Sequence, residues 1–367
     1  MARAPLRVGL VGANSERGWA THSHVPALQA LPMFEIAGIA ARSRALAEKA
    51  APAYGNARCY EDAYDLIASP DIDVVTVSVK VPEHLPIVLA GLESGKHMFC
   101  EWPLGRNVAE AETMAAAAAK ARGRVIIGCQ GTGAPAIRRA AEIAASGALG
   151  ALRTARVISP SAGWEPEAAS PYIYLNQHVN GANMLSIPGG HTLACVLMTL
   201  GPYAELQAQT TIQHRRIPIT DTGETIERDT PDHLALIGRH ANGCVSTVEV
   251  IAGHPPRIPF LFGVSGDRGE LKVTSFAEGA FQTGQSDLET DLDVAPPPPP
   301  VVAGLVGPAM NVAEIYAQLA ETIRTGEQQG CDFEFAATLT RLLAAVKHSA
   351  DTGRRVRLDE KGREISA

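Results

Sequence analysis

Alternation between short apolar strands and helices over about the first 130 residues is the feature that most constrains this fold. Residues 6–12 (LRVGLVG) and 72–79 (IDVVTVSV) are short, largely apolar segments that contain several valines, which is typical of strands buried on both faces. Residues 43–55 and 108–123 instead have alanine-rich helical spacing and end in glycine. This order predicts an α/β domain with a doubly wound parallel sheet.

The pattern changes from about residue 151. Residues 232–253 (DHLALIGRHANGCVSTVEVIAG) alternate polar and apolar side chains around HANG, which predicts a hairpin turn. We therefore expect an antiparallel sheet in a second, α+β domain. Residues 295–304 are too rich in proline for a helix or a central strand and predict an extended loop. Two amphipathic helices, each closed by glycine, follow it.

Composition excludes several classes of protein. The formal net charge is −7 and the charges are mixed along the chain, which argues against nucleic-acid binding. The six cysteines form no C-x-x-C pair and no zinc-ligand spacing, so we expect no metal site. The sequence shows no signal peptide and no apolar run long enough to span a membrane, which predicts a cytoplasmic protein.

The first strand ends in a glycine that opens a candidate phosphate-binding turn. Gly12 is followed by Asn14 where a dinucleotide fingerprint has its second glycine, and Gly18 lies one residue late for the third. Asn14 tolerates a left-handed backbone, and the Ser15 hydroxyl could reach a phosphate oxygen. The match to the fingerprint is weak, and the alternative is an ordinary tight turn between a strand and a helix. The position of the turn at the start of an α/β domain favours dinucleotide binding.

The residues at the end of the second strand indicate which dinucleotide the chain would bind. An NAD-selective site places an acid here to bind the ribose hydroxyls, but this chain has Ala41, followed by Arg42, Ser43 and Arg44. Two guanidinium groups and a hydroxyl suit a 2′-phosphate, so NADP(H) is favoured, and NAD(H) remains an option. The alternative is a solvated basic helix start.

Residues 77–105 (VSVKVPEHLPIVLAGLESGKHMFCEWPLG) resemble the glucose–fructose oxidoreductase/inositol dehydrogenase/MocA-type (Gfo/Idh/MocA) family, which has G-K-H followed by E-K-P in this segment. Residues 18–28 (GWATHSHVPAL) and the E-W pair resemble more closely the subgroup of the fungal galactose-regulon repressor, a non-enzymatic member. SPYIY, GGHT, TPDHL and GDRGELKV extend this likeness through the second half of the chain.

The resemblance implies a Rossmann domain at 1–128 that binds NAD(P) and a substrate-binding and oligomerisation domain at 129–367, with an open, mostly antiparallel sheet. It also implies a homo-oligomer, a dimer or a tetramer. The residues expected to bind the cofactor, from the motifs and the resemblance together, are Gly12, Asn14, Ser15, Trp19, Arg42, Ser43, Arg44, Ser78, Val79, His84, Glu101, Trp102 and Gln130.

The catalytic lysine of the family is replaced by Trp102 here. The family's catalytic histidine corresponds to His191, but Ile187 and Ala194 stand where many members have acids. We expect His191 to act as proton donor or acceptor and Lys80 to orient the reacting oxygen. The alternatives are a packing or capping role for His191, a solvated Lys80 and a Trp102 that only fills the core.

A polar and aromatic cluster is expected to line the substrate pocket; it comprises Tyr172, Tyr174, Asn176 and His178. The sequence thus predicts an NAD(P)-dependent oxidoreductase acting on a secondary alcohol or carbonyl of a carbohydrate-like or cyclic hydroxylated small molecule. The alternative is a non-catalytic, NADP-binding sensor that binds a partner protein. Both are compatible with the family, because fold alone does not fix function.

Overall fold

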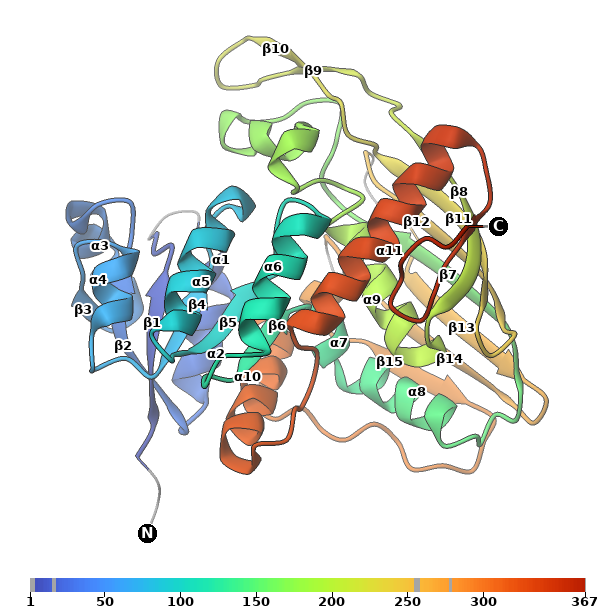
Figure 1. Cartoon of the computed structure of the whole chain (residues 1–367), viewed down its shortest axis with the longest axis horizontal. Coiled ribbons are helices and arrows are strands. Elements are labelled where there is room, and N and C mark those ends of the chain that lie inside the picture. The colour runs from blue at the N-terminus through green and yellow to red at the C-terminus, as the bar shows by residue number, and fades with distance from the viewer. Residues whose placement is uncertain (1–3, 15–17, 254–257, 277–278, 367) are drawn as a thin grey trace. The chain divides into compact units, whose positions relative to one another are not determined.

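A computed structural model describes residues 4–14, 18–253, 258–276 and 279–366 of the chain (Figure 1). It forms two compact units, each described by itself below. The first unit comprises Met1–Gly105, Ala109–Gly133 and Pro300–Ala337, and the second comprises Arg106–Val108, Ala134–Pro299 and Thr338–Ala367. Among the described residues, no helix is long and apolar enough to cross a membrane.

The first unit is built on a parallel sheet of six strands in the order β3-β2-β1-β4-β5-β6. This is the strand order of a dinucleotide-binding Rossmann fold. The β-branched runs form strands because both of their faces are buried, and all four residues of β4 are inaccessible to solvent. The strands are β1 (Leu6–Val11), β2 (Phe34–Ala40), β3 (Arg58–Cys59), β4 (Val74–Val77), β5 (His97–Glu101) and β6 (Val125–Gly128).

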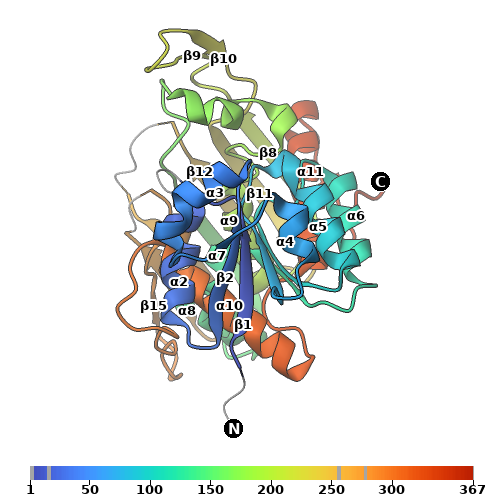
Figure 2. The same ribbon diagram turned by 90° about the vertical axis from the view of Figure 1, so that its left-hand side faces the viewer.

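Helices cover both faces of this sheet, with α4, α5 and α6 on one face and α2 and α10 on the other (Figure 2). The doubly wound prediction is therefore confirmed. The helices are α1 (Trp19–His22), α2 (His24–Ala30), α3 (Arg44–Ala50), α4 (Ala63–Ala68), α5 (His84–Glu93), α6 (Val108–Ala118), α7 (Gln130–Gly133) and α10 (Pro308–Thr325), with short 3-10 turns at Ala51–Tyr54 and Val81–Glu83.

Helix α10 comes late in the chain but belongs to the first unit. Its buried face, with Val312, Ile315, Tyr316 and Leu319, joins the core formed by α2 and the parallel sheet. The sequence boundary placed all residues after 128 in a second domain, whereas the structure groups Pro300–Ala337 with the first unit. The reason is this apolar face, which is buried against α2.

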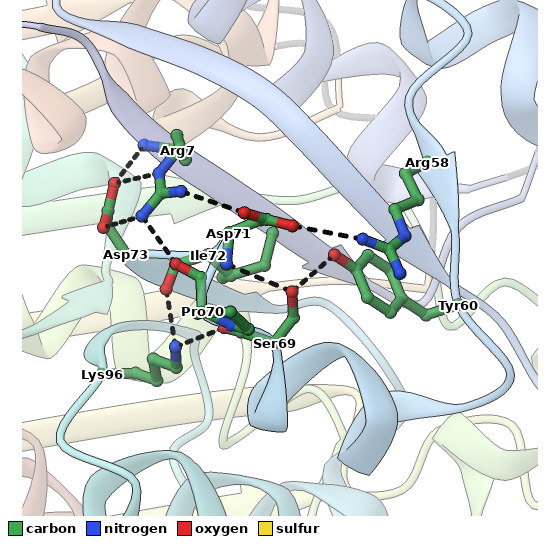
Figure 3. A network of polar contacts seen from close by, with 9 residues as sticks. All are labelled: Arg7, Arg58, Tyr60, Ser69, Pro70, Asp71, Ile72, Asp73 and Lys96. Carbon is green, nitrogen blue, oxygen red and sulfur yellow. Dashed lines mark hydrogen bonds and ion pairs between the residues drawn. The ribbon is translucent and has the colours of Figure 1, made fainter.

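A polar network joins the amino ends of the strands in the first unit (Figure 3). Arg7 forms an ion pair with Asp73 just before β4, and its Nε donates to Asp73 Oδ2 over 3.0 Å. The Lys96 ammonium, just before β5, donates to the carbonyl oxygens of Ser69 and Ile72, each over 2.7 Å. These contacts fix the loop before β4 at the edge opposite the carboxyl ends of the strands.

The second unit contains a mixed, mostly antiparallel sheet of eight strands in the order β15-β14-β13-β7-β12-β11-β8-β16. The β7–β12 pair is parallel, and the other pairs described are antiparallel. The strands are β7 (Leu152–Pro160), β8 (Tyr203–Thr211), β11 (His233–His240), β12 (Val245–Ile251), β13 (Phe260–Gly266), β14 (Glu270–Ser275), β15 (Asp287–Thr290) and β16 (Val356–Arg357). The predicted α+β class is confirmed.

One face of this sheet is covered by α8 (Pro135–Ala145), α9 (Pro188–Leu200) and the part of α11 (Phe333–Thr352) that begins at Thr338. The HANG sequence forms the predicted turn, with the amide of Gly243 donating to the carbonyl of His240 over 2.9 Å. A small separate hairpin consists of β9 (Arg216–Pro218) and β10 (Thr225–Glu227). The proline-rich stretch after β15 forms neither helix nor strand.

Candidate functional site

The carboxyl ends of β1 and β4 meet where the strand order of the first sheet reverses direction. Gly12 follows β1 with a φ of 104°, and a Cβ added there would lie 2.4 Å from the carbonyl oxygen of Ser78. The amide of Ser78 donates in turn to the carbonyl of Val11 over 2.9 Å. Only glycine fits this position, and the crevice at such a reversal is where open α/β sheets bind nucleotides.

The turn after Gly12 is anchored by Tyr54. The Tyr54 hydroxyl lies 3.1 Å from the amide nitrogen of Asn14 and 3.0 Å from Thr21 Oγ1, and Thr21 also donates to the Asn14 carbonyl. Trp19 opens helix α1 and is partly exposed, at 36%. The predicted phosphate ligand Ser15 lies outside the described residues.

At the end of β2, the three predicted ligands of a 2′-phosphate differ in their surroundings. Arg42 is exposed, and Ser43 caps helix α3 by accepting a hydrogen bond from the amide of Leu46 over 3.4 Å. Arg44 donates to Glu48 Oε1 over 2.9 Å, and this contact raises the pKa of Arg44. Arg44 is thus already paired with a carboxylate, whereas Arg42 is exposed at the end of β2.

At the end of β4, Val79 and His84 are held by internal contacts. His84 is buried; its Nε2 lies 3.1 Å from the Val79 carbonyl, and its Nδ1 lies 3.2 Å from the Leu104 carbonyl and 3.4 Å from Cys100 Sγ. Burial lowers the pKa of His84. Lys80, the predicted orienting residue, is exposed. His84 therefore braces the strand end, and its contact with a cofactor stays a prediction.

Glu101, at the end of β5, lies in a buried chain of polar contacts. His24 Nε2 donates to Glu101 Oε1 over 3.0 Å, and Gln130 Nε2 donates to Glu101 Oε2 over 2.7 Å. On its other side, His24 Nδ1 lies 2.9 Å from the Tyr316 hydroxyl, which lies 2.8 Å from Thr76 Oγ1. Both carboxylate oxygens of Glu101 therefore have a donor, which fixes the orientation of the group.

Trp102 replaces the family lysine directly after Glu101. Its side chain is buried, with 6% of the residue exposed. A tryptophan indole is a neutral hydrogen-bond donor, so it can neither transfer a proton nor supply the positive charge of the lysine ammonium. Its burial is compatible with a packing role, and its contact with a cofactor stays a prediction.

In the second unit, His191 is the fourth residue of α9 and is buried. Its Nδ1 has no hydrogen-bond partner among the described residues. Burial lowers the pKa of His191 to about 3, so the imidazole is neutral at pH 7. Ile187 and Ala194, at the positions of the flanking acids, supply no carboxylate. A neutral imidazole with an unoccupied nitrogen can still accept or donate one hydrogen bond to a ligand.

A cavity of about 730 Å³ lies within the second unit. The predicted substrate residues Tyr172, Tyr174 and Asn176 line it, and Pro188, one turn before His191 on α9, also lines it. Tyr172 is exposed and Tyr174 is half-buried, and burial raises the pKa of Tyr174. His178 is exposed and is not among the cavity-lining residues. Three of the four predicted substrate residues are thus brought together.

Asn176 supports the cavity wall. Its Oδ1 accepts a hydrogen bond from Arg228 Nε over 2.7 Å, and its Nδ2 donates to the Tyr172 carbonyl over 3.1 Å. Arg228 is fully buried and forms an ion pair with Asp232. The distance from Arg228 Nη1 to Asp232 Oδ2 is 3.2 Å. The amide of Asn176 therefore holds Tyr172 and Arg228 in place.

Sequence reasoning missed four residues of these sites: His24, Tyr316, Trp164 and Arg228. His24 lies in the THSHVPAL segment that carries the resemblance to the subgroup, so this resemblance could have indicated His24 as a site residue. Arg228 and Asp232 are four residues apart, a spacing that suits an ion pair. Trp164 and Tyr316 carried no local signal, because their partners lie far away in the sequence.

Two family descriptions match the chain. Residues 6–129 match "Oxidoreductase family, NAD-binding Rossmann fold", and residues 135–275 match "Gal80p, C-terminal domain". The chain is 31% identical to dehydrogenase aclE of Aspergillus oryzae over 289 residues, which is 73% of this chain and 76% of that protein. It is 28% identical to the galactose/lactose metabolism regulatory protein GAL80 of Saccharomyces cerevisiae over 301 residues, which is 75% and 68% of the two chains.

Solved structures agree on the fold. A super-repressor mutant of Gal80p from Saccharomyces cerevisiae superposes with a TM-score of 0.85 at 22% identity, covering 98% of this chain and 99% of that one. Levoglucosan dehydrogenase in complex with NADH and L-sorbose gives a TM-score of 0.82 at 22% identity, covering 97% and 99%. The fold and site define a protein with a Rossmann domain and a companion α+β domain. The chain belongs to the Gfo/Idh/MocA oxidoreductase family, near the Gal80 subgroup.

Proposed function

We propose that the chain is an NADP(H)-dependent oxidoreductase that transfers a hydride to or from a secondary alcohol or carbonyl of a carbohydrate-like or cyclic hydroxylated small molecule. The observation that carries the proposal is the cavity of about 730 Å³ in the second unit, which has aromatic and polar walls and includes residues of the turn before His191. This size and lining suit one small polar molecule. The likeness to a dehydrogenase at 31% identity supports a catalytic role.

The first unit has residues that fit a dinucleotide. Gly12 lets the backbone of the turn approach Ser78 closely, at the reversal of strand order where a pyrophosphate would lie. Arg42 and Ser43 offer a guanidinium and a hydroxyl at the end of β2, where the 2′-phosphate of NADP(H) would bind. Glu101 is held by two donors and would orient the nicotinamide ribose. The bound dinucleotide would supply or accept the hydride.

On the substrate side, His191 would exchange the proton of the reacting hydroxyl. Its buried Nδ1 lacks a partner among the described residues, and a substrate hydroxyl would satisfy it. Lys80 would orient the reacting oxygen as a point charge. Since no flanking carboxylate raises the basicity of His191, proton transfer would depend on this imidazole alone.

A substrate screen tests this function. NADPH absorbance is followed with the full-length chain over sugars, inositols, uronic acids and cyclic carbonyls, in both reaction directions. Turnover of one of these classes with NADP(H) supports the proposal. Binding of NADP(H) without any turnover across the whole panel overturns it.

A second candidate is a non-catalytic NADP-binding regulatory protein that binds a partner protein. The replacement of the family lysine by buried Trp102 favours it, as does the similarity to GAL80 proteins. The same screen distinguishes the two functions, because a regulator binds the cofactor and a ligand but turns neither over.

We also propose that the protein is a homo-oligomer, a dimer or a tetramer. On β11 and β12 the exposed face of the second sheet carries Ile237 and Val245, which are 53% and 39% exposed. Apolar side chains on an open sheet face are typical of an interface. Light scattering at micromolar concentration that shows only a 38.6 kDa species would contradict this assembly.

A further inference from the structure

The wall of the cavity in the second unit includes an aromatic side chain in an unusual backbone conformation. Trp164 has a φ of 58° and follows Gly163, which has a φ of 95°. Left-handed backbone is unfavourable for a bulky side chain and persists where surrounding contacts hold it. Such positions cluster at ligand-binding sites, which makes Trp164 a candidate ligand contact.

Both ends of Trp164 are fixed by hydrogen bonds. The indole Nε1 donates to the carbonyl of Leu175 over 3.2 Å. Arg228 Nη1 donates to the carbonyl of Trp164 over 2.7 Å, and Arg228 Nη2 donates to the carbonyl of Glu165 over 2.8 Å. The ring is therefore held in one orientation before any ligand arrives, which lowers the entropic cost of binding.

Arg228, which fixes this loop, is itself anchored on all sides. Its Nε donates to Asn176, and its Nη1 pairs with the carboxylate of Asp232, which is also fully buried. The charge of Arg228 is therefore neutralised inside the protein, although the residue lines the cavity. It acts as a positioning residue for Trp164 and adds little net positive charge for a ligand.

The remaining ionic groups of the cavity wall are carboxylates. Glu165 and Glu167 line the cavity, and among its described lining residues the single cation is the paired Arg228. Carboxylates accept hydrogen bonds from hydroxyl groups and repel anions. The cavity thus favours a ligand with many hydroxyl groups and no negative charge.

We propose that Trp164 is the specificity-determining residue of this cavity and stacks on the apolar face of an uncharged, polyhydroxylated ring. The C–H bonds on one face of a sugar ring carry slight positive charge and suit the negative face of an indole. Glu165 and Glu167 exclude the corresponding uronates. This inference rests on the proposed carbohydrate-like substrate and names its charge class and its binding platform.

The test measures binding and not turnover, so that it can fail separately from the proposed function. Saturation-transfer NMR on the full-length chain, with NADPH present, gives dissociation constants for glucose, galactose and mannose and for their uronates. We expect at least one neutral sugar to bind at least about tenfold more tightly than its uronate. Equal or tighter binding of the uronates, or no binding of any neutral sugar at millimolar concentration, would overturn the proposal.

Variants of Trp164 test the platform. Trp164→Asn removes the ring and keeps a residue type that tolerates left-handed backbone, so sugar binding should weaken about tenfold. Trp164→Phe keeps a ring and should stay within about threefold of the parent. Tyr64→Ala, which removes an exposed aromatic ring from helix α4 of the first unit, is the matched control. Unchanged binding by Trp164→Asn contradicts the assignment.

Should Trp164→Asn fail to fold, Glu167→Gln tests the charge argument instead. Glutamine has the same shape as glutamate, and Glu167 lies on an exposed part of the cavity wall, so this variant should fold. The preference for the neutral sugar over its uronate should then fall at least about threefold. An unchanged preference contradicts the charge argument. Sugar binding that depends on Trp164 without any NADPH turnover would leave this inference standing while the oxidoreductase proposal fails.

Discussion

The imidazole of His24 and the carboxylate of Glu101, 77 residues apart in the sequence, are joined by a hydrogen bond of 3.0 Å in the interior of the first unit. The opposite ring nitrogen of His24 contacts the hydroxyl of Tyr316, 292 residues further along the chain. One imidazole thus connects the end of β5 to helix α10. The carboxylate that is expected next to the nicotinamide ribose is held by the core of the fold.

Replacing His24 should destabilise the protein. His24→Ala leaves Glu101 Oε1 and the Tyr316 hydroxyl without their buried partner, which costs about 1–3 kcal/mol. Urea unfolding measures the effect, and His22→Ala, an exposed histidine two residues earlier, is the control and should stay within about 0.5 kcal/mol. A double-mutant cycle of His24→Ala with Tyr316→Phe should give a coupling free energy of about 0.5–3 kcal/mol. Strict additivity would show that the contact contributes nothing.

Arg42 should govern the preference for NADP(H). Arg42→Ala removes a charge-assisted contact to the 2′-phosphate worth about 1.5–3 kcal/mol, so NADPH should bind roughly 10–150-fold more weakly while NADH binding is unchanged. Arg44→Ala should have a smaller effect, because Arg44 pairs with Glu48. Calorimetric titration of both cofactors measures these affinities. Parallel losses for NADPH and NADH, or NADH binding as tightly as NADPH in the parent, would refute the assignment.

Lys96 should stabilise the amino edge of the parallel sheet. Lys96→Met keeps the aliphatic stem but removes two hydrogen bonds of 2.7 Å to the carbonyls of Ser69 and Ile72 (Figure 3). We expect a loss of about 1–3 kcal/mol in the free energy of unfolding. Lys120→Met, at an exposed position near the end of helix α6, is the matched control and should be nearly neutral. Equal stabilities of the two variants would rule out this role.

The parts of the fold that followed from the sequence are those with a local signal. The valine run of β4 and the glycine after β1 predicted a buried strand and a tight turn, and the HANG turn predicted its hairpin. Pairings between distant segments could not be predicted in this way. Arg228 binds the Trp164 carbonyl across 64 residues, and neither side chain carries a periodic pattern that indicates its partner. Helix α10 likewise packs on α2, about 280 residues earlier in the chain, and no local pattern indicates that contact.

His191 should make the protein sensitive to acid. Burial lowers its pKa to about 3, below the ~6.5 of a solvated imidazole, so the unfolded chain binds this proton first as the pH falls. The stability due to the neutral ring is complete above about pH 6.5 and is lost progressively toward pH 3, by about 2 kcal/mol at pH 5. His191→Gln should therefore lose less stability than the parent between pH 7 and pH 5 in urea unfolding. His22→Gln, exposed, is the control, and an identical pH dependence of parent and His191→Gln would contradict the assignment.

The same residue gives the sharpest test of catalysis. If His191 exchanges the substrate proton, His191→Gln should lower turnover about 10²–10⁴-fold with a substrate found in the screen, because glutamine forms hydrogen bonds but does not titrate. NADP(H) affinity should stay unchanged, since the cofactor residues lie in the first unit. Thr199→Val on the same helix removes a buried hydroxyl that, like His191 Nδ1, has no hydrogen-bond partner among the described residues, and it should leave turnover intact. Parental turnover by His191→Gln would remove this histidine from the mechanism and leave Lys80 as the remaining candidate for polarising the reacting oxygen.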